Sequence, residues 1–74
     1  MCLGIPMEIV SLNGSLARCQ RHGIERDVDI FLLSDAPPVP GDFVLVHVGY
    51  AIKKIEKEEA ITRWQLIDQM QSQD

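Results

Sequence analysis

The sequence predicts a mostly β protein, a small OB-like five-stranded barrel with a C-terminal α-helix. Short segments with β-branched residues and turn residues between them fill about the first fifty positions, which is typical of strands. The rest of the chain has apolar residues at three- and four-residue steps, the period of an amphipathic helix. Closure of the sheet would remove its exposed edges. A half-open sheet covered by the helix is the alternative.

The chain of 74 residues is expected to form one domain, with the barrel at about 5–54. Strands are expected at 5–12, 15–21, 24–33, 43–48 and 50–54. Asn13-Gly14 favours a type I′ hairpin turn, since both central residues of that turn need a positive φ. Pro6 can donate no ladder hydrogen bond, so it is expected at a strand start or on an edge. The prolines of the 34–42 segment predict a loop.

The strand at 43–48 is nearly all apolar, which indicates that both of its faces are covered. Gly49 interrupts the pattern and suggests a bulge or a close backbone approach. A helix is expected at 56–71, with acidic residues in its first turn. Its predicted apolar stripe consists of Ala60, Ile61, Trp64, Ile67 and Met70.

Composition argues against several classes of function. The formal net charge is −4, and the basic residues form no cluster beyond Lys53-Lys54, so we expect no nucleic-acid partner. No apolar run reaches the roughly 20 residues of a membrane span, and no signal peptide is expected. With 2 cysteines, the chain is expected to be cytoplasmic with reduced thiols. A chain this short favours a binding or carrier module over a self-contained enzyme.

Cys2 is the first candidate for chemistry. Removal of Met1 by the usual aminopeptidase would give one residue with both a thiol and a free α-amine. The positively charged α-amine would favour the thiolate form of the side chain. A thiolate is a nucleophile and a soft ligand for iron, zinc or cuprous ions. Without that processing the thiol remains and the amine does not. The opposing interpretation is that a cysteine in second position is incidental.

His47 is the second candidate. A histidine in an apolar strand is usually a packed residue with a satisfied ring nitrogen, but it can also be a metal ligand or a proton carrier near neutral pH. Cys19 and His22 form a Cys-x-x-His step, which matches no usual zinc finger. An inward Cys19 and a turn His22 are the simpler interpretation.

Several segments together resemble the HypC/HupF family of nickel–iron hydrogenase maturation chaperones. They cover most of the chain and comprise Met-Cys-Leu-Gly-Ile-Pro at 1–6, Gly-Ile-Glu-Arg-Asp-Val-Asp at 23–29, Gly-Asp-Phe-Val-Leu-Val-His-Val-Gly-Tyr-Ala-Ile at 41–52, and Glu-Glu-Ala at 58–60. Met7 departs from the pattern, because a small residue, usually glycine, is expected there.

The resemblance implies a small OB-like barrel that is not an enzyme. It implies two partners, a HypD-like iron–sulfur protein and the hydrogenase large-subunit precursor. It also implies a transiently bound Fe(CN)2CO fragment and no permanent cofactor. By resemblance, Cys2 would contact the partner and ligate iron, and His47 would be a second metal ligand. The expected partner-binding residues are Met1, Cys2, Leu3, Gly4, Ile5 and Pro6.

Two other hypotheses remain at this point. In one, the chain is a protein-only adaptor in which Cys2 makes partner contacts without carrying metal. In the other, the chain is an OB-type nucleic-acid binder, which would need aromatic residues among basic ones. Phe31, Phe43 and Tyr50 do not lie in such a setting.

Overall fold

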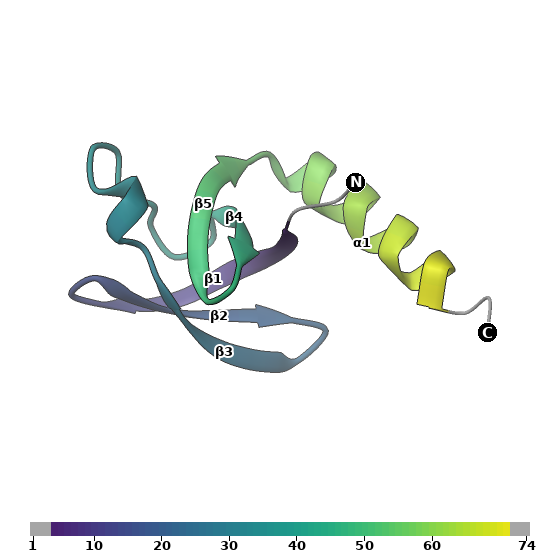
Figure 1. The fold of residues 1–74 in the computed structure, drawn as a ribbon, viewed down its shortest axis with the longest axis horizontal. Helices are drawn as coiled ribbons and strands as arrows, with labels where there is room; N and C mark the ends of the chain where they lie inside the picture. Colours follow the sequence, from purple (N-terminus) through teal and green to yellow (C-terminus); the bar gives the residue numbers. More distant parts are fainter. Residues whose placement is uncertain (1–3, 72–74) are drawn as a thin grey trace.

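The fold is a closed five-stranded barrel followed by one helix, as predicted (Figure 1). The structure is a computed structural model that describes residues 4–71, the side chains of 69–71 excepted. Its elements are β1 (Ile5–Asn13), β2 (Leu16–Arg21), β3 (Ile24–Asp29), the 3-10 helix η1 (Phe31–Leu33), β4 (Phe43–His47), β5 (Tyr50–Ile55) and α1 (Lys57–Gln71).

The strands follow each other around the barrel in the order β1-β2-β3-β5-β4. The long strand β1 pairs with β4 through its first residues, where Ile5 lies opposite Val46, and with β2 through the rest. The barrel closes between β3 and β5, which meet in parallel at Asp29 and Tyr50. The half-open sheet is therefore excluded.

The first hairpin differs from the predicted turn. Asn13 is the last residue of β1, opposite Leu16, so the loop consists of Gly14 and Ser15. Gly14 has φ 64° and Asn13 is not among the residues with positive φ, which is the pattern of a type II′ turn and not of type I′. The prediction placed Asn13 and Gly14 at the centre of the turn, one position before the observed loop of Gly14 and Ser15.

The double positive-φ pattern occurs at the other two hairpins instead. His22 and Gly23 have φ values of 53° and 82°, and Val48 and Gly49 have φ values of 52° and 83°. Gly49 thus belongs to a two-residue turn and not to a bulge, but a close backbone approach does occur there, because the Gly49 carbonyl accepts a hydrogen bond of 2.9 Å from the Asp29 amide.

The third strand is shorter than predicted, because it ends at Asp29 and not at residue 33. The carboxylate of Asp29 accepts a hydrogen bond of 2.8 Å from the Phe31 amide, which turns the chain into η1. The Ile30 amide donates to the Ser15 carbonyl at 2.8 Å, and the Ile30 side chain is buried. The apolar alternation continued into η1 because this segment also packs against the core.

The barrel interior is filled by alternate side chains of the strands. The buried cluster consists of Met7, Ile9, Ala17, Cys19, Val28, Ile30, Val44 and Ala51. On β4, Val44 faces this interior, while Phe43 and Leu45 are buried on the other side, where α1 lies. The prediction that β4 is covered on both faces is confirmed.

The helix α1 packs against β1 and β4 with its first turns and then projects beyond the barrel (Figure 1). Ala60 is fully buried and Trp64 and Ile67 are partly buried, whereas Ile61 is 39% exposed. The buried apolar stripe of α1 is therefore narrower than predicted, because Ile61 does not belong to it. The side chain of Met70 lies outside the described residues. None of the helices in the described part is long and apolar enough to span a membrane.

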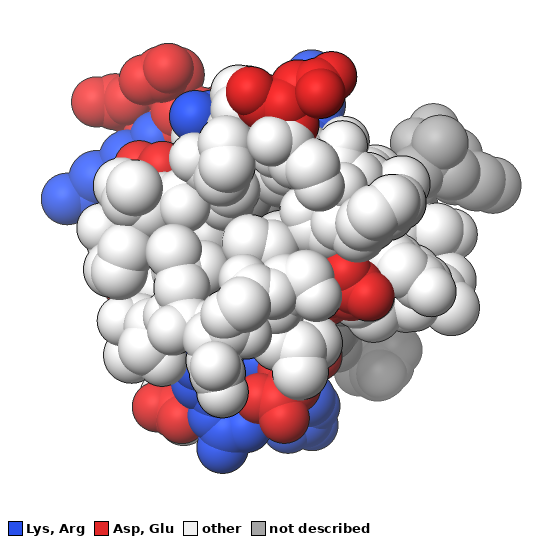
Figure 2. Space-filling view, turned by 90° about the vertical axis from the view of Figure 1, so that its left-hand side faces the viewer, with Lys and Arg blue, Asp and Glu red and all other residues white. Residues whose placement is uncertain are grey.

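One end of the barrel carries a largely uncharged face. Figure 2 shows charged side chains above and below this face and few across it. The face lies on the β1–β2 hairpin and η1 side, where Leu12, Leu16, Phe31 and Leu32 are exposed. Phe31 is 67% exposed, which is unusual for so large an apolar ring. Exposed apolar patches of this kind often mark contacts with other proteins.

Candidate functional site

The predicted N-terminal site is only partly described by the structure. Met1, Cys2 and Leu3 lie outside the described residues. Of the other predicted residues, Gly4 and Pro6 are buried and Ile5 is 44% exposed. The described part of this segment is thus seated on the barrel, with one apolar side chain facing solvent.

Gly4 allows the chain to lie directly against β4. A Cβ atom at this position would come within 3.2 Å of the Val46 carbonyl oxygen and 3.5 Å of the Leu45 Cβ. The first of these contacts is too close to be accommodated without a shift of β4, and its nearest atom belongs to backbone. Glycine therefore suits this close approach, because any other residue would need the Val46 carbonyl to move by a few tenths of an ångström.

His47 is the last residue of β4 and is exposed. It lies opposite Tyr50, across the Val48-Gly49 turn. Among the residues whose side chains the structure describes, no hydrogen-bond or ion-pair partner is found for its imidazole. The usual interpretation of a histidine in an apolar strand, a packed ring with a satisfied nitrogen, is wrong here.

The structure brings His47 and the described N-terminal residues to the same end of the β1–β4 pair. Ile5 lies opposite Val46, the residue before His47. Gly4 immediately precedes β1, and a Cβ built on it would lie 3.2 Å from the Val46 carbonyl oxygen. Gly4, the first residue that the structure describes, therefore lies beside the end of β4 that carries His47.

A second apolar layer between α1 and the barrel supports this segment. Pro6 is fully buried and lies opposite Leu45. Its carbonyl accepts a hydrogen bond of 2.6 Å from the indole Nε1–H of Trp64. Phe43 meets the Trp64 ring edge-on, with 5.7 Å between ring centroids. No pattern in the sequence indicated this hydrogen bond, which joins residues 58 positions apart.

Pro6 also shows why a proline is tolerated within a strand. It is the second residue of β1, where β4 lies on one side and the pairing with β2 has not yet begun. The predicted position at a strand start is confirmed.

The Cys19-x-x-His22 step does not form a metal site. The side chain of Cys19 is fully buried in the barrel interior, and burial raises the pKa of its thiol to about 11. His22 lies in the β2–β3 turn, where its Nε2 is 3.4 Å from a carboxylate oxygen of Asp68. No cluster of three metal-ligating side chains occurs in the part of the chain that the structure describes. The simpler interpretation of this step is confirmed.

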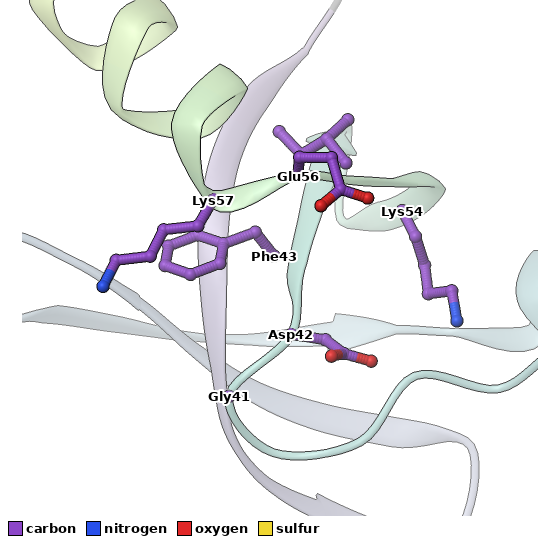
Figure 3. A pocket seen from close by; sticks show the side chains of 7 residues that line it. Gly41, Asp42, Phe43, Lys54, Glu56 and Lys57 are labelled. Carbon is purple, nitrogen blue, oxygen red and sulfur yellow. The ribbon is translucent and has the colours of Figure 1, made fainter.

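A shallow hollow of about 330 Å³ lies where β4 begins and β5 leads into α1 (Figure 3). It is lined by Gly41, Asp42, Phe43, Lys54, Ile55, Glu56 and Lys57. Two carboxylates and two ammonium groups surround it, so the charges of the lining balance and favour neither an anion nor a cation.

Comparison with known proteins completes the description of the site. The model of the HupF/HypC family matches residues 1–67. This chain belongs to the HupF/HypC family. The resemblance found in the sequence is thereby confirmed. The match includes the N-terminal residues, His47 and Trp64.

The relatives are similar over most of this chain. The "hydrogenase maturation factor HypC" of Escherichia coli K12 is 41% identical over 64 residues, which are 81% of this chain and 71% of that protein. The "hydrogenase maturation factor HybG" of the same strain is 36% identical over 75 residues, covering 95% of this chain and 92% of HybG. The "hydrogenase expression/formation protein HupF" of Rhizobium leguminosarum bv. viciae is 38% identical over 60 residues, and this chain spans only 59% of its length.

Proposed function

We propose that this member of the HupF/HypC family is a hydrogenase maturation chaperone. In the proposed reaction sequence it binds a HypD-like iron–sulfur protein and helps to assemble the Fe(CN)2CO fragment there. It then binds the precursor of the hydrogenase large subunit and delivers the fragment. The chain performs no catalysis in this scheme, and the iron fragment is its cargo. The cytoplasm, where reduced thiols persist, remains the predicted compartment.

The proposal rests mainly on the placement of the described N-terminal residues beside His47. Cys2 precedes Gly4 by two residues, and two residues span at most about 7 Å. Since a Cβ built on Gly4 would lie 3.2 Å from the Val46 carbonyl oxygen, this length of chain would allow the Cys2 thiol and the His47 imidazole to reach one metal ion. The exposure of His47 leaves its ring accessible to a ligand.

The two side chains suit a transfer role. A thiolate is a soft ligand for iron, and a neutral imidazole is a common metal ligand near neutral pH. Two protein ligands leave other positions on the iron for the diatomic ligands and for groups of the donor or acceptor protein. A fragment held by so few ligands can be exchanged from one protein to the next.

The exposed apolar side chains also favour a role in protein binding. Leu12, Leu16, Phe31 and Leu32 give the barrel an uncharged face that a solitary domain has no need to expose. This observation supports partner binding in general and does not distinguish the two proposed partners.

Co-purification with the HypD-like partner under anaerobic conditions, followed by infrared spectroscopy, tests the proposal. Cyanide and carbonyl stretching bands are expected in the complex, and they should disappear in Cys2→Ala. Cys19→Ala is the matched control, because Cys19 is buried inside the barrel. His47→Ala is expected to weaken the bands. Bands of full strength in Cys2→Ala would contradict the proposal.

The alternative function is a protein-only adaptor, in which Cys2 makes contacts and carries no metal. It predicts an intact complex that shows no cyanide or carbonyl stretching bands. In that case Cys2→Ala would only weaken association with the partner.

A further inference from the structure

We infer that Trp64 is a positioning residue for the N-terminal segment, which it holds through the carbonyl group of Pro6. The inference rests on the proposed function, because it matters only if Cys2 has to be presented to a partner or an iron fragment. It assigns a role in presentation to α1, which the proposed function leaves unused.

The hydrogen bond from Trp64 to Pro6 lies in a mostly apolar layer. Pro6 is fully buried, and the indole Nε1 donates to its carbonyl oxygen at 2.6 Å. A proline has no amide N–H, so its carbonyl is the only backbone group through which this residue can be held by a hydrogen bond. A buried acceptor that loses its donor becomes strongly unfavourable. The bond therefore ties β1 to α1 at the point where the N-terminal segment enters the barrel.

The indole itself is held in place from the barrel side. Phe43 of β4 contacts it edge-on, and the ring of His22 lies 5.4 Å from it, tilted by 47°. One helical turn further on, Asp68 receives a hydrogen bond of 2.8 Å from Arg21 and lies 3.4 Å from the His22 ring nitrogen. The β2–β3 hairpin thus fixes α1 on one side of the indole and β4 fixes the ring on the other.

The N-terminal segment is consequently held from two directions. Gly4 lies against the Val46 carbonyl of β4, and Pro6 is bound by Trp64 of α1. Proline also restricts its own φ to a narrow range. These three restraints fix the backbone from Gly4 to Pro6, to which residues 1–3 are attached. Loss of the bond from Trp64 would therefore loosen the segment that carries Cys2.

The test compares a variant that removes the hydrogen bond with one that lies outside this arrangement. Trp64→Phe keeps an aromatic ring but loses the N–H donor, while Cys19→Ala removes a group buried inside the barrel and keeps the donor. Amide hydrogen exchange is measured by nuclear magnetic resonance on the whole chain, and urea unfolding gives the global stability of each variant. We expect exchange at Ile5 and Met7 to rise in Trp64→Phe by about tenfold more than exchange at Val28 does, as for a local opening that one hydrogen bond had suppressed. In Cys19→Ala all three amides should change by the same factor.

An equal change at Ile5, Met7 and Val28 in Trp64→Phe would overturn the inference, since it would mean a purely structural role. The unmodified protein provides a measurement that does not depend on a variant. Its indole N–H should exchange as slowly as the Met7 amide; exchange as fast as in free tryptophan, with Met7 still protected, would also overturn the inference.

Function is then read from the infrared bands of the complex with the HypD-like partner. If Trp64 presents Cys2, the bands should be weaker in Trp64→Phe than in the unmodified chain and change little in Cys19→Ala. Unchanged bands in Trp64→Phe would refute the positioning role. Bands that are absent even with the unmodified chain would instead refute the proposed function, while the exchange measurements would still decide whether Trp64 holds the segment.

Discussion

Raising the pH is expected to destabilise the barrel through Cys19. The thiol is fully buried, and burial raises its pKa from the ordinary value of 9.0 to about 11, because a thiolate inside the barrel would lose its hydration. Below the unfolded-state pKa both states hold the proton and the stability is complete. As the pH rises further, the unfolded chain releases its proton first, so the free energy of unfolding falls until the folded pKa is passed.

The size of the effect follows from the shift. One pKa unit corresponds to about 1.4 kcal/mol, so a rise from 9.0 to about 11 corresponds to roughly 3 kcal/mol when titration is complete. At about pH 10, halfway through the interval, the expected loss is about 1.4 kcal/mol. Such a loss is a sizeable part of the stability of a small domain.

Urea unfolding followed by the fluorescence of the single tryptophan, Trp64, measures the effect at several pH values. The unmodified chain is compared with Cys19→Ala, which leaves a small cavity at every pH but cannot titrate at this position. The other ionisable groups are common to both chains and cancel in the difference. A difference in stability that stays constant from about pH 7 to about pH 10 would refute the argument.

Three further predictions concern the barrel and the site. Ile9→Ala is expected to lower the free energy of unfolding by about 2–5 kcal/mol, because Ile9 is 1% exposed and its removal leaves a cavity. His47→Ala should change it by less than about 0.5 kcal/mol, because the side chain is exposed. Gly4→Ala should cost about 1 kcal/mol, because crowding of the Val46 carbonyl outweighs the lower entropy of the unfolded chain.

Urea unfolding measures all three, and each has an opposing outcome. A loss of well under about 1 kcal/mol for Ile9→Ala would mean that the interior is loosely packed. A loss for His47→Ala as large as that for Ile9→Ala would mean that the imidazole is a structural group. If Gly4→Ala stabilised the chain, β4 would have to yield to the new methyl group.

The barrel could be predicted because alternation and turn residues are local signals. The β-branched runs and the glycine turns located all five strands to within a few residues, except at the end of β3. There, Ile30 and Leu33 still pack against the core, so the apolar pattern continues although the backbone has already turned. Alternation reports which side chains are buried and does not report the backbone hydrogen bonds that end a strand.

The turn after β1 shows a similar limit. Asn13-Gly14 is a strong hairpin signal, but the pairing of Asn13 with Leu16 moved the loop by one residue. That register is set by contacts of β1 with two different strands, which a two-residue motif does not contain.

The site could be predicted only in part. Cys2 and His47 were singled out by residue type, and the structure adds that His47 is exposed beside the start of the described chain. The contact between Trp64 and Pro6 was not foreseen, because a stripe of apolar residues predicts which face of a helix is buried and not which polar atom the buried indole meets. The place of Cys2 relative to His47 stays a prediction.

The way the barrel closes has a consequence for where it opens locally. β3 and β5 share one residue pair, Asp29 with Tyr50, and the Asp29 amide donates to Gly49 at 2.9 Å. Every other neighbouring pair of strands shares at least four residue pairs. We therefore expect thermal fluctuation to separate β3 from β5 before any other pair of strands, which opens the barrel into a curved sheet. The 3-10 helix η1 packs against β5 and thereby helps to hold β5 against β3.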